Sequence, residues 1–311
     1  MKTIACALML AALPAVAAAA ERPDWAFPPP GVTGAPRKPE TGELKQVPGS
    51  SKTYTQSQID SFNEPPDWFP DEHPPMPSIV AHGRGREVRA CISCHLSTGY
   101  GHPENSRLPG ASAGYIARQL AEFKSGVRKG AANMLTFTKA MSDEEMKTAA
   151  EYFASLPVKR WTRVVETDTV PKTRLTGNVF FPLPDQGTEP IGNRIIESPE
   201  NTERFDLRDP HSGFVAYVPK GSIAKGAALV ASGGAGKTFV CGMCHGTDLM
   251  GLGPVPGIAG RSPSYLMRQL WDIKQGARKG VWSPLMKQVV TNLTQDDMLN
   301  IVAYVSSVKG Q

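Results

Sequence analysis

Two short stretches decide the fold of this chain: CISCH at residues 91–95 and CGMCH at residues 241–245. Each is a C-x-x-C-H motif, the attachment signature of a c-type haem. Its two thiols can add to the two vinyl groups of one haem, and the histidine that follows can bind the iron. Cysteine pairs at this spacing also occur in disulfides and zinc sites. Because a histidine follows both pairs, and together they use every cysteine after Cys6, we predict two haem c groups attached through Cys91, Cys94, Cys241 and Cys244.

The histidine of each motif is the predicted proximal ligand of a haem iron. His95 and His245 should each bind iron through one ring nitrogen and donate the other N–H to a backbone carbonyl, which fixes the tautomer. The prolines that follow, Pro103 and Pro254, are the expected sources of those carbonyls. The alternative for these prolines is a role in turns alone.

The chain contains an internal repeat, because the two motifs lie 150 residues apart and their surroundings match at the same offset. This offset aligns Gly110 with Gly260, Ser112 with Ser262, Tyr115 with Tyr265, Arg118 with Arg268, Gln119 with Gln269, and the Arg-Lys-Gly runs 128–130 and 278–280. Two extra residues then shift the offset to 152, which aligns Met134 with Met286 and Ser142 with Thr294. We therefore expect a duplicated haem domain.

Both copies are predicted to be helical. The expected helices are 78–89, 113–125 and 142–155 in the first copy, and 221–231, 263–275 and 294–306 in the second. Ser112 and Ser262 are natural N-caps for the middle helices. Ser142, with glutamate three residues later, begins a capping box, and Thr294 begins a weaker counterpart.

The sixth iron ligand decides whether a haem only passes electrons or also binds small molecules. Met134 and Met286 occupy the same repeat position, eight residues before the cap of the last helix, and are the predicted ligands. Methionine also fills gaps in cores, which is the alternative. Met141, His102 and His82 are weaker candidates in the first copy, because none has a repeat partner able to bind iron.

Arginines repeat beside the methionines and are candidates for binding haem propionates. Arg128 and Arg278, with Arg118 and Arg268, carry guanidinium groups whose geometry suits a carboxylate. The alternative is that these arginines are solvated residues on a helix face.

The first twenty residues predict export. Lys2, an apolar run from Ile4 to Val16 and small residues up to Ala20 are typical of a signal peptide cleaved after Ala20. The apolar run is too short for a membrane anchor, and no later stretch approaches the length of a membrane span. The mature protein is expected to be periplasmic. Its basic residues are scattered, with a formal net charge of +5, so nucleic acid is not an expected partner.

Two segments fall outside the repeat. Residues 21–77 are rich in proline but contain aromatic residues, which favours an arm pinned to a surface over a disordered tail. Residues 157–220 contain β-like stretches at 161–165, 178–181 and 213–218. We expect this insertion to form short strands that bridge the domains and either set the haem–haem geometry or provide a docking face.

The chain resembles the tandem dihaem cytochromes of the c4 type. The shared features are the two C-x-x-C-H motifs, Tyr-x-x-Arg-Gln-Leu at 115–120 and 265–270, Gly-x-Arg at 126–128 and 276–278, and a methionine before each last helix. The resemblance covers about residues 79–156 and 221–308, and it implies two class I cytochrome folds with His/Met haems. The layout also resembles cytochrome subunits that accompany periplasmic dehydrogenases. The proline-rich arm and the long insertion depart from the family pattern.

The predicted architecture is mainly α. It comprises a signal peptide (1–20), an N-terminal arm (21–77), a first cytochrome c domain (78–156), an insertion (157–220) and a second cytochrome c domain (221–311). The predicted function is electron transfer without substrate chemistry, with a periplasmic dehydrogenase as donor and a further cytochrome or a terminal oxidase as acceptor. The alternative is a dihaem enzyme of the peroxidase kind, which needs one haem with an open face.

Overall fold

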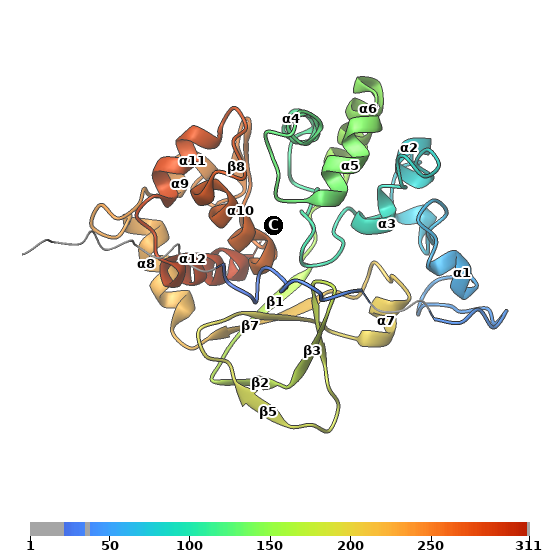
Figure 1. The fold of residues 1–311 in the computed structure, drawn as a ribbon, viewed down its shortest axis with the longest axis horizontal. Helices are drawn as coiled ribbons and strands as arrows, with labels where there is room; N and C mark the ends of the chain where they lie inside the picture. The colour runs from blue at the N-terminus through green and yellow to red at the C-terminus, as the bar shows by residue number, and fades with distance from the viewer. Residues whose placement is uncertain (1–21, 35–37, 310–311) are drawn as a thin grey trace, which may run out of the picture.

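The computed structural model describes residues 22–34 and 38–309, so the predicted signal peptide lies outside the described residues. Two helical domains face each other, and a strand-rich layer packs beneath both (Figure 1). The second domain (orange to red) lies on the left, the first (cyan to green) on the right, and the insertion (yellow) below. The sequence repeat therefore corresponds to two separate helical bodies.

The helices follow the repeat. The first domain contains α2 (Ser78–Ala81), α3 (Ile92–His95), α4 (Ala113–Lys124), α5 (Ala132–Ala140) and α6 (Asp143–Ser155). The second contains α8 (Ser222–Ser232), α9 (Gly242–His245), α10 (Pro263–Gln275), α11 (Ser283–Val290), α12 (Gln295–Ser307) and a hairpin of β8 (Gly251–Leu252) and β9 (Val255–Pro256). Ser112 and Ser262 cap α4 and α10, and both predicted capping boxes form, at Ser142 and Thr294.

One helix is much shorter than predicted. Residues 78–89 were expected to be helical, but α2 ends at Ala81. Gly83 has a φ of +65°, and a Cβ there would run into the backbone at Val88. The chain turns back at this glycine and forms an isolated antiparallel bridge between Arg84 and Val88. The prediction of a long first helix in the first domain was therefore wrong, whereas α8 matches its predicted range.

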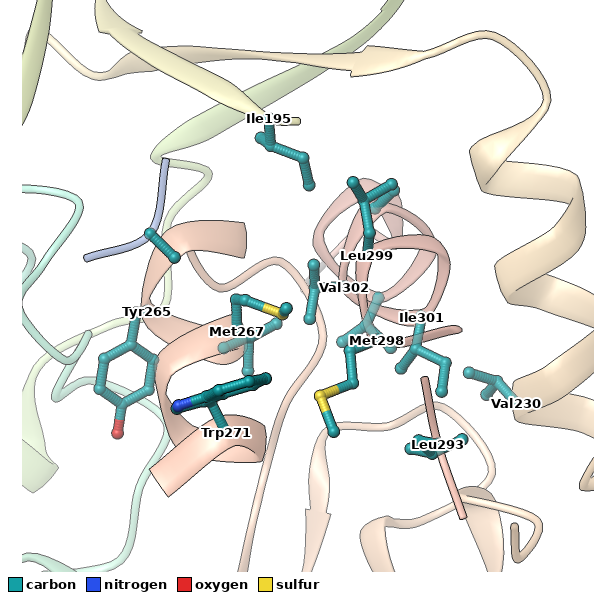
Figure 2. Packing of buried hydrophobic residues seen from close by; sticks show 14 of the residues in the cluster. Ile195, Val230, Tyr265, Met267, Trp271, Leu293, Met298, Leu299, Ile301 and Val302 are labelled. Atoms are coloured by element: carbon teal, nitrogen blue, oxygen red, sulfur yellow. The ribbon is translucent and has the colours of Figure 1, made fainter. Parts of the chain in front are cut away.

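Each domain has its own apolar core. The first is built around Ile116, Met146 and Phe153, where α4 packs on α6. In the second, Met267 and Trp271 of α10 meet Met298 and Val302 of α12 (Figure 2). Figure 2 also shows Ile195, from the insertion, pointing into this second core from above; its side chain is fully buried. The insertion is thus packed against the second domain.

The insertion is richer in strands than the rest of the molecule. Its strands are β1 (Thr162–Thr167), β2 (Thr169–Pro171), β3 (Thr173–Thr176), β4 (Val179–Pro182), β5 (Thr188–Pro190), β6 (Ile196–Pro199) and β7 (Phe214–Pro219). Strand β7 is central in a three-stranded sheet, parallel to β1 and antiparallel to β6. The helix α7 (Thr202–Asp206) was not predicted. Mainly α therefore describes the two haem domains, and the whole chain has mixed content.

The N-terminal arm contacts both the second domain and the insertion. Ala26 is completely buried in the core of the second domain. Further along, α1 (Gln56–Ile59) and the 3-10 turn η1 (Pro70–Glu72) flank a small cluster of Val47, Ile59 and Trp68. The Trp68 indole N–H donates to the carbonyl of Leu207 at 2.7 Å, which ties the arm to the segment after α7. No helix among the described residues is long and apolar enough to cross a membrane.

Candidate functional site

A cavity of about 400 Å³ lies in the first domain, within the range typical of ligand pockets. Its walls bring together Cys91, Cys94 and His95 from the first motif and Met134 from α5. The cavity extends to the second domain, where Tyr265, Arg268, Gln269 and Asp272 of α10 complete the wall. Residues as far apart in the chain as Val88 and Asp272, 184 positions, therefore share one cavity.

The motif histidines are oriented by equivalent backbone carbonyls. His95 Nδ1 lies 3.2 Å from the carbonyl oxygen of Ser106, and His245 Nδ1 lies 2.8 Å from that of Pro256. Both acceptors follow their histidine by eleven residues. Burial lowers the pKa of His95 to about 4 and lowers that of His245 as well, although each carbonyl contact opposes the shift. Each ring is thus held neutral, with Nε2 facing away from the carbonyl contact.

The prediction that Pro103 and Pro254 supply these carbonyls was wrong. Their carbonyls join the two domains instead: that of Pro103 accepts from the Ser262 hydroxyl at 2.8 Å, and that of Pro254 from Arg118 at 3.3 Å. The carbonyl that contacts each histidine belongs to a residue slightly further along the chain. It is Ser106, three residues after Pro103, for His95, and Pro256, two residues after Pro254, for His245.

The first cysteine of each motif lies in an environment that disfavours the thiolate form. Burial raises the pKa of Cys91 to about 12 and that of Cys241 to about 11. Zinc binds cysteine as thiolate, usually with four protein ligands. Within the described ranges, no group of three histidine, cysteine or acidic side chains converges as a metal site. Both observations favour thioether attachment over a zinc site.

The candidate sixth ligands occupy distinct places. Met134 lines the first cavity, and Met286 on α11 packs against the core of the second domain. Met141 also borders the cavity but is 5% exposed and belongs to the first core. His102 contacts Glu104 at 3.4 Å, and His82 lies at the surface, 2.9 Å from Glu64.

Arg128 and Arg278 meet at the interface between the domains. Arg128 donates to Gln119 of its own domain at 2.7 Å and to Gln269 of the other at 2.9 Å. Arg278 does the reverse, donating to Gln269 at 2.9 Å and to Gln119 at 2.8 Å. Burial, and then the charge of Arg278, lowers the pKa of Arg128. Two cations of equivalent sequence position thus lie together, and the side chains to which they donate are glutamines and tyrosines.

Two tyrosines complete this pseudo-two-fold contact. Arg278 donates to the Tyr115 hydroxyl at 3.0 Å, and Arg128 lies 3.5 Å from that of Tyr265. Burial disfavours the phenolate of Tyr265, but the guanidinium groups outweigh it and lower its pKa to about 8. The guanidinium groups of Arg128 and Arg278 thus lie next to both tyrosines where the cavity reaches the interface, and the carboxylate of Asp272 lies in the same wall.

The backbones also pair across the interface. The amide of Lys129 donates to the carbonyl of Ala277 at 2.8 Å, and that of Lys279 to the carbonyl of Val127 at 3.0 Å. The next residue of each run is a glycine. A Cβ on Gly130 would collide with Asp272, and a Cβ on Gly280 would collide with Glu122. The Arg-Lys-Gly runs are thus the contact by which the two copies pack.

A second pair of arginines has unsatisfied N–H groups. Arg107 and Arg261 are 6% and 4% exposed, and Arg261 donates to the backbone carbonyl of Arg107. Nε and Nη2 of Arg107 and Nη2 of Arg261 are buried without any acceptor from the protein. Burial, and then the charge of Arg261, lowers the pKa of Arg107 to about 9. Buried guanidinium groups without acceptors fit carboxylates, such as haem propionates, in the cavity that Arg107 lines.

Sequence analysis missed this second pair because it does not follow the repeat. Residue 257, equivalent to Arg107, is glycine, and residue 111, equivalent to Arg261, is alanine. The only available signal was an arginine close to each motif. Of the arginines that were singled out, Arg128 and Arg268 line the first cavity.

A buried carboxylate joins the insertion to both domains. Glu197 on β6 is 1% exposed and accepts from the Thr162 hydroxyl at 3.2 Å and the Ser262 hydroxyl at 2.7 Å. Ser262 caps α10 and also contacts Pro103 of the first domain. Burial raises the pKa of Glu197. Glu197 therefore lies where insertion, first domain and second domain meet.

Comparison with known proteins places these sites in context. No family model matches the chain. It is 38% identical over 78 residues to cytochrome c-554(548) of Halomonas halodenitrificans, covering 25% of this chain and 94% of that protein. It is 41% identical over 82 residues to cytochrome c4 of Pseudomonas aeruginosa, covering 25% of this chain but only 38% of that protein.

A longer similarity covers most of the chain. The chain is 25% identical over 229 residues to a thiosulfate dehydrogenase electron acceptor of Stutzerimonas stutzeri, covering 73% of this chain and 82% of that protein. Its fold is similar to part of the thiosulfate dehydrogenase (TsdBA) of Marichromatium purpuratum, with a TM-score of 0.50 and 22% identity. That match covers 74% of this chain and 38% of the other.

Proposed function

This chain belongs to the c-type cytochromes and carries two haem c groups, and from that premise we propose that it relays electrons from a periplasmic dehydrogenase to a further redox protein. The observation that carries the proposal is the repeated site: two C-x-x-C-H loops whose histidines are each held by the backbone carbonyl eleven residues further along the chain. When bound, haem supplies an iron that changes its charge by one electron.

We assign His95 and His245 as proximal ligands and Met134 and Met286 as distal ligands. The carbonyl of Ser106 or Pro256 accepts Nδ1–H, so Nε2 is the nitrogen available to iron. Met134 supports its assignment by lining the same cavity as His95. Two protein ligands on each iron suit electron transfer rather than binding of small molecules, and a thioether ligand raises the reduction potential.

The arginines at the interface would hold the propionates. Arg107, Arg128 and Arg268 line the cavity, and Arg107 has two N–H groups without protein acceptors. Each propionate would neutralise part of the positive charge of these buried guanidinium groups. Arg107 and Arg128 contact the second domain and Arg268 belongs to it, so the side chains that would hold the propionates lie where the two domains meet.

We propose the class of electron donor from the similarity that extends over 229 residues. A relative that aligns with 73% of this chain is named as an electron acceptor of thiosulfate dehydrogenase. We propose a dehydrogenase of a small periplasmic substrate as the donor, and a cytochrome or a terminal oxidase as the acceptor. The predicted signal peptide supports the periplasmic compartment.

An optical redox titration of the purified holoprotein tests this function. Two haems that both show the near-infrared methionine–iron band and both titrate at positive potentials are expected. A haem without the band, or one that binds carbon monoxide when reduced, would contradict the relay and favour the peroxidase alternative. Haem content per chain, measured on the same sample, separates a missing ligand from a missing haem.

A further inference from the structure

Glu197 is a buried acid held rigidly on strand β6 of the insertion. Just before it, Ile195 points into the core of the second domain (Figure 2), and Ile196 belongs to a separate apolar cluster within the insertion. The residue opposite Glu197 on β7 is Ala216, which is fully buried. The strand is therefore fixed by packing, and the Glu197 side chain, 1% exposed, is held against the start of α10.

The hydroxyl of Ser262 links Glu197 to the first domain. Its oxygen lies 2.7 Å from Oε2 of Glu197 and 2.8 Å from the carbonyl oxygen of Pro103, and both are ordinary distances for O–H···O hydrogen bonds. A hydroxyl group carries one hydrogen and two lone pairs. Ser262 can therefore donate to only one of these two oxygens at a time.

A proton on Glu197 removes this competition. The backbone N–H of Tyr265 already donates to the Ser262 oxygen at 3.2 Å. When Oε2 of Glu197 carries a proton, it donates to the other lone pair of Ser262, and the Ser262 hydrogen is free to donate to Pro103. An ionised Glu197 accepts that hydrogen itself, and in the described part of the chain no other donor reaches the Pro103 carbonyl. Only the neutral acid satisfies all three contacts of the hydroxyl.

The other groups in contact with Glu197 are neutral donors. The Thr162 hydroxyl of β1 lies 3.2 Å from Oε1, and the Ser264 amide, in the first turn of α10, lies 3.4 Å from Oε2. Strands β4 and β7, which pack against β6, contain one titratable side chain, that of Tyr217, which lies opposite Ile196. The two donors favour an ionised carboxyl, but neither carries a charge.

Arg268 on α10 is the cation whose charge acts on Glu197. It also faces the carboxylates of Glu104 and Asp272, so three acids share its charge. Its N–H groups donate elsewhere, to the backbone carbonyls of Ala26 and Glu104 and to the side chain of Asn178. Burial outweighs the neutral donors and raises the pKa of Glu197. The direction of this shift agrees with the count of hydrogens at Ser262.

The repeat partner of Ser262 lacks this arrangement. Ser112 caps α4 in the same way, accepting from the amide of Tyr115, but it is exposed. Glu197 belongs to the insertion, which has no counterpart in the repeat. The contact is therefore a property of the inserted segment and of the second domain's helix cap, and not of the duplicated haem domain.

We propose that Glu197 is a neutral acid in the folded protein, and that its proton joins the insertion, the second domain and the first domain in one pH-sensitive contact. With the proton in place, Glu197 donates to Ser262 and Ser262 donates to Pro103. When the proton leaves to solvent, Ser262 donates to the carboxylate and Pro103 loses its donor. This goes beyond the proposed electron relay and does not depend on it.

Infrared spectroscopy of the oxidised holoprotein tests for the proton directly. At about pH 6, glutamates with the ordinary pKa of about 4.3 are ionised, so the carbonyl band of a protonated carboxyl group reports an acid whose pKa is raised. We expect Glu197→Gln to lose the intensity of one carboxyl group per chain, whereas its amide can still donate to Ser262. The control is Glu200→Gln, because Glu200 is exposed and pairs with Arg163 at 3.5 Å. Its band should match that of wild type.

Denaturant unfolding at different pH values tests the contact. Because the folded-state pKa of Glu197 is raised, its contribution to stability is complete below about pH 4.3 and is lost as the pH rises through the folded-state value. The unfolding midpoint of wild type should therefore fall from pH 5 to 8 relative to that of Glu197→Gln. Glu200→Gln should follow wild type.

A carboxyl band that is unchanged in Glu197→Gln would overturn the neutral acid. If the band is lost but wild type and Glu197→Gln have parallel pH profiles, the pH-sensitive contact is overturned. Should Glu197→Gln fail to fold, Ser262→Ala gives the second reading: it removes the acceptor of the acid proton, so the band should shift in frequency, and an unshifted band overturns the proposal. None of these measurements requires the haems to change oxidation state, so they remain decisive if the relay fails.

Discussion

The two haem domains share a sequence pattern but differ in what surrounds them. In the first, Ile92 and Ser93 of the attachment loop are buried beneath the arm and Arg208. In the second, Met243 is 71% exposed. The non-repeated segments, rather than the repeat, create this difference. Duplication thus supplied two equivalent redox sites, and the added segments made them inequivalent towards solvent.

The contact between the domains shows the opposite tendency. Arg128 and Arg278 exchange matching hydrogen bonds with Gln119 and Gln269, so this interface keeps the symmetry of the repeat. The symmetry breaks at Arg107 and Arg261, which have no arginine counterparts. The contact between the domains therefore combines repeated residues with unrepeated ones, because Arg261 donates across it to the carbonyl of Arg107.

The largest expected effect tests whether the distal ligands are equivalent. Met134→Ala should lower the potential of the first haem by on the order of 100 mV, within the roughly 0.8 V that axial ligands span, and remove its methionine–iron band. Met286→Ala should do the same for the second haem only. Optical redox titration measures both.

The matched control for this pair is Met141→Leu, because its repeat partner is Leu293. Met141 belongs to the first core, so the replacement should keep the band and cost less than about 1.5 kcal/mol. Loss of the band in Met141→Leu, and its survival in Met134→Ala, would reverse the assignment.

The symmetry of the interface is tested by paired glycine replacements. Gly130→Ala and Gly280→Ala should each lower the free energy of unfolding by about 1–3 kcal/mol, since the new Cβ meets a buried carboxylate of the opposite domain. Denaturant unfolding measures the loss. Gly114→Ala, in α4 with open space around it, should instead stabilise by about 0.5–1 kcal/mol. If the two replacements lowered the free energy of unfolding by different amounts, the interface would be less symmetric than the pattern of its hydrogen bonds indicates.

The covering of the first attachment loop is tested at Arg208. Arg208→Ala removes the donor to the Ser93 carbonyl and should lower the free energy of local opening at residues 91–95 by about 1.5–3 kcal/mol. Amide hydrogen exchange of this loop, compared with 241–245, measures the change. Lys38→Ala, which removes an exposed ion pair with Asp206, should change the free energy of local opening at residues 91–95 by less than about 1 kcal/mol. Unchanged exchange in Arg208→Ala would mean that the arm alone covers the loop.

The smallest expected effect is a pH dependence of the arm. His73 lies 3.0 Å from Asp67, which raises the pKa of His73 despite burial, and it also faces Glu72 and the ring of Tyr152. Because the folded-state pKa is raised, this contribution is complete below about pH 6.5 and is lost as the pH rises through the folded-state value. Limited proteolysis of residues 61–77 should therefore speed up from pH 5.5 to 8. In His73→Gln this rise should disappear; a rise that persists would assign it to another group.

The sequence by itself predicted the two attachment motifs, the number of haems and the helices α4, α6, α8, α10 and α12, but not α5 and α11, which carry the two methionines. These features are local: C-x-x-C-H fixes thiols and imidazole within five residues, and the caps at Ser112, Ser262, Ser142 and Thr294 act within one helical turn. The repeat added the pairing of Met134 with Met286. The short α2 was missed because a positive φ at Gly83 depends on close packing against Val88.

Only the tertiary structure decided how these sites are surrounded. Three features depend on contacts between residues that are not neighbours in the sequence. They are the carbonyls of Ser106 and Pro256 that contact the histidines, the unsatisfied N–H groups of Arg107 and Arg261, and the hydrogen bond from Arg208 to Ser93. Arg208 and Ser93 lie 115 positions apart, and Arg261 and Arg107 lie 154 apart. Local propensity and periodicity carry no information at such separations, because the partners are chosen by the packing of whole segments. Two nearly identical motifs therefore became one covered and one open redox site.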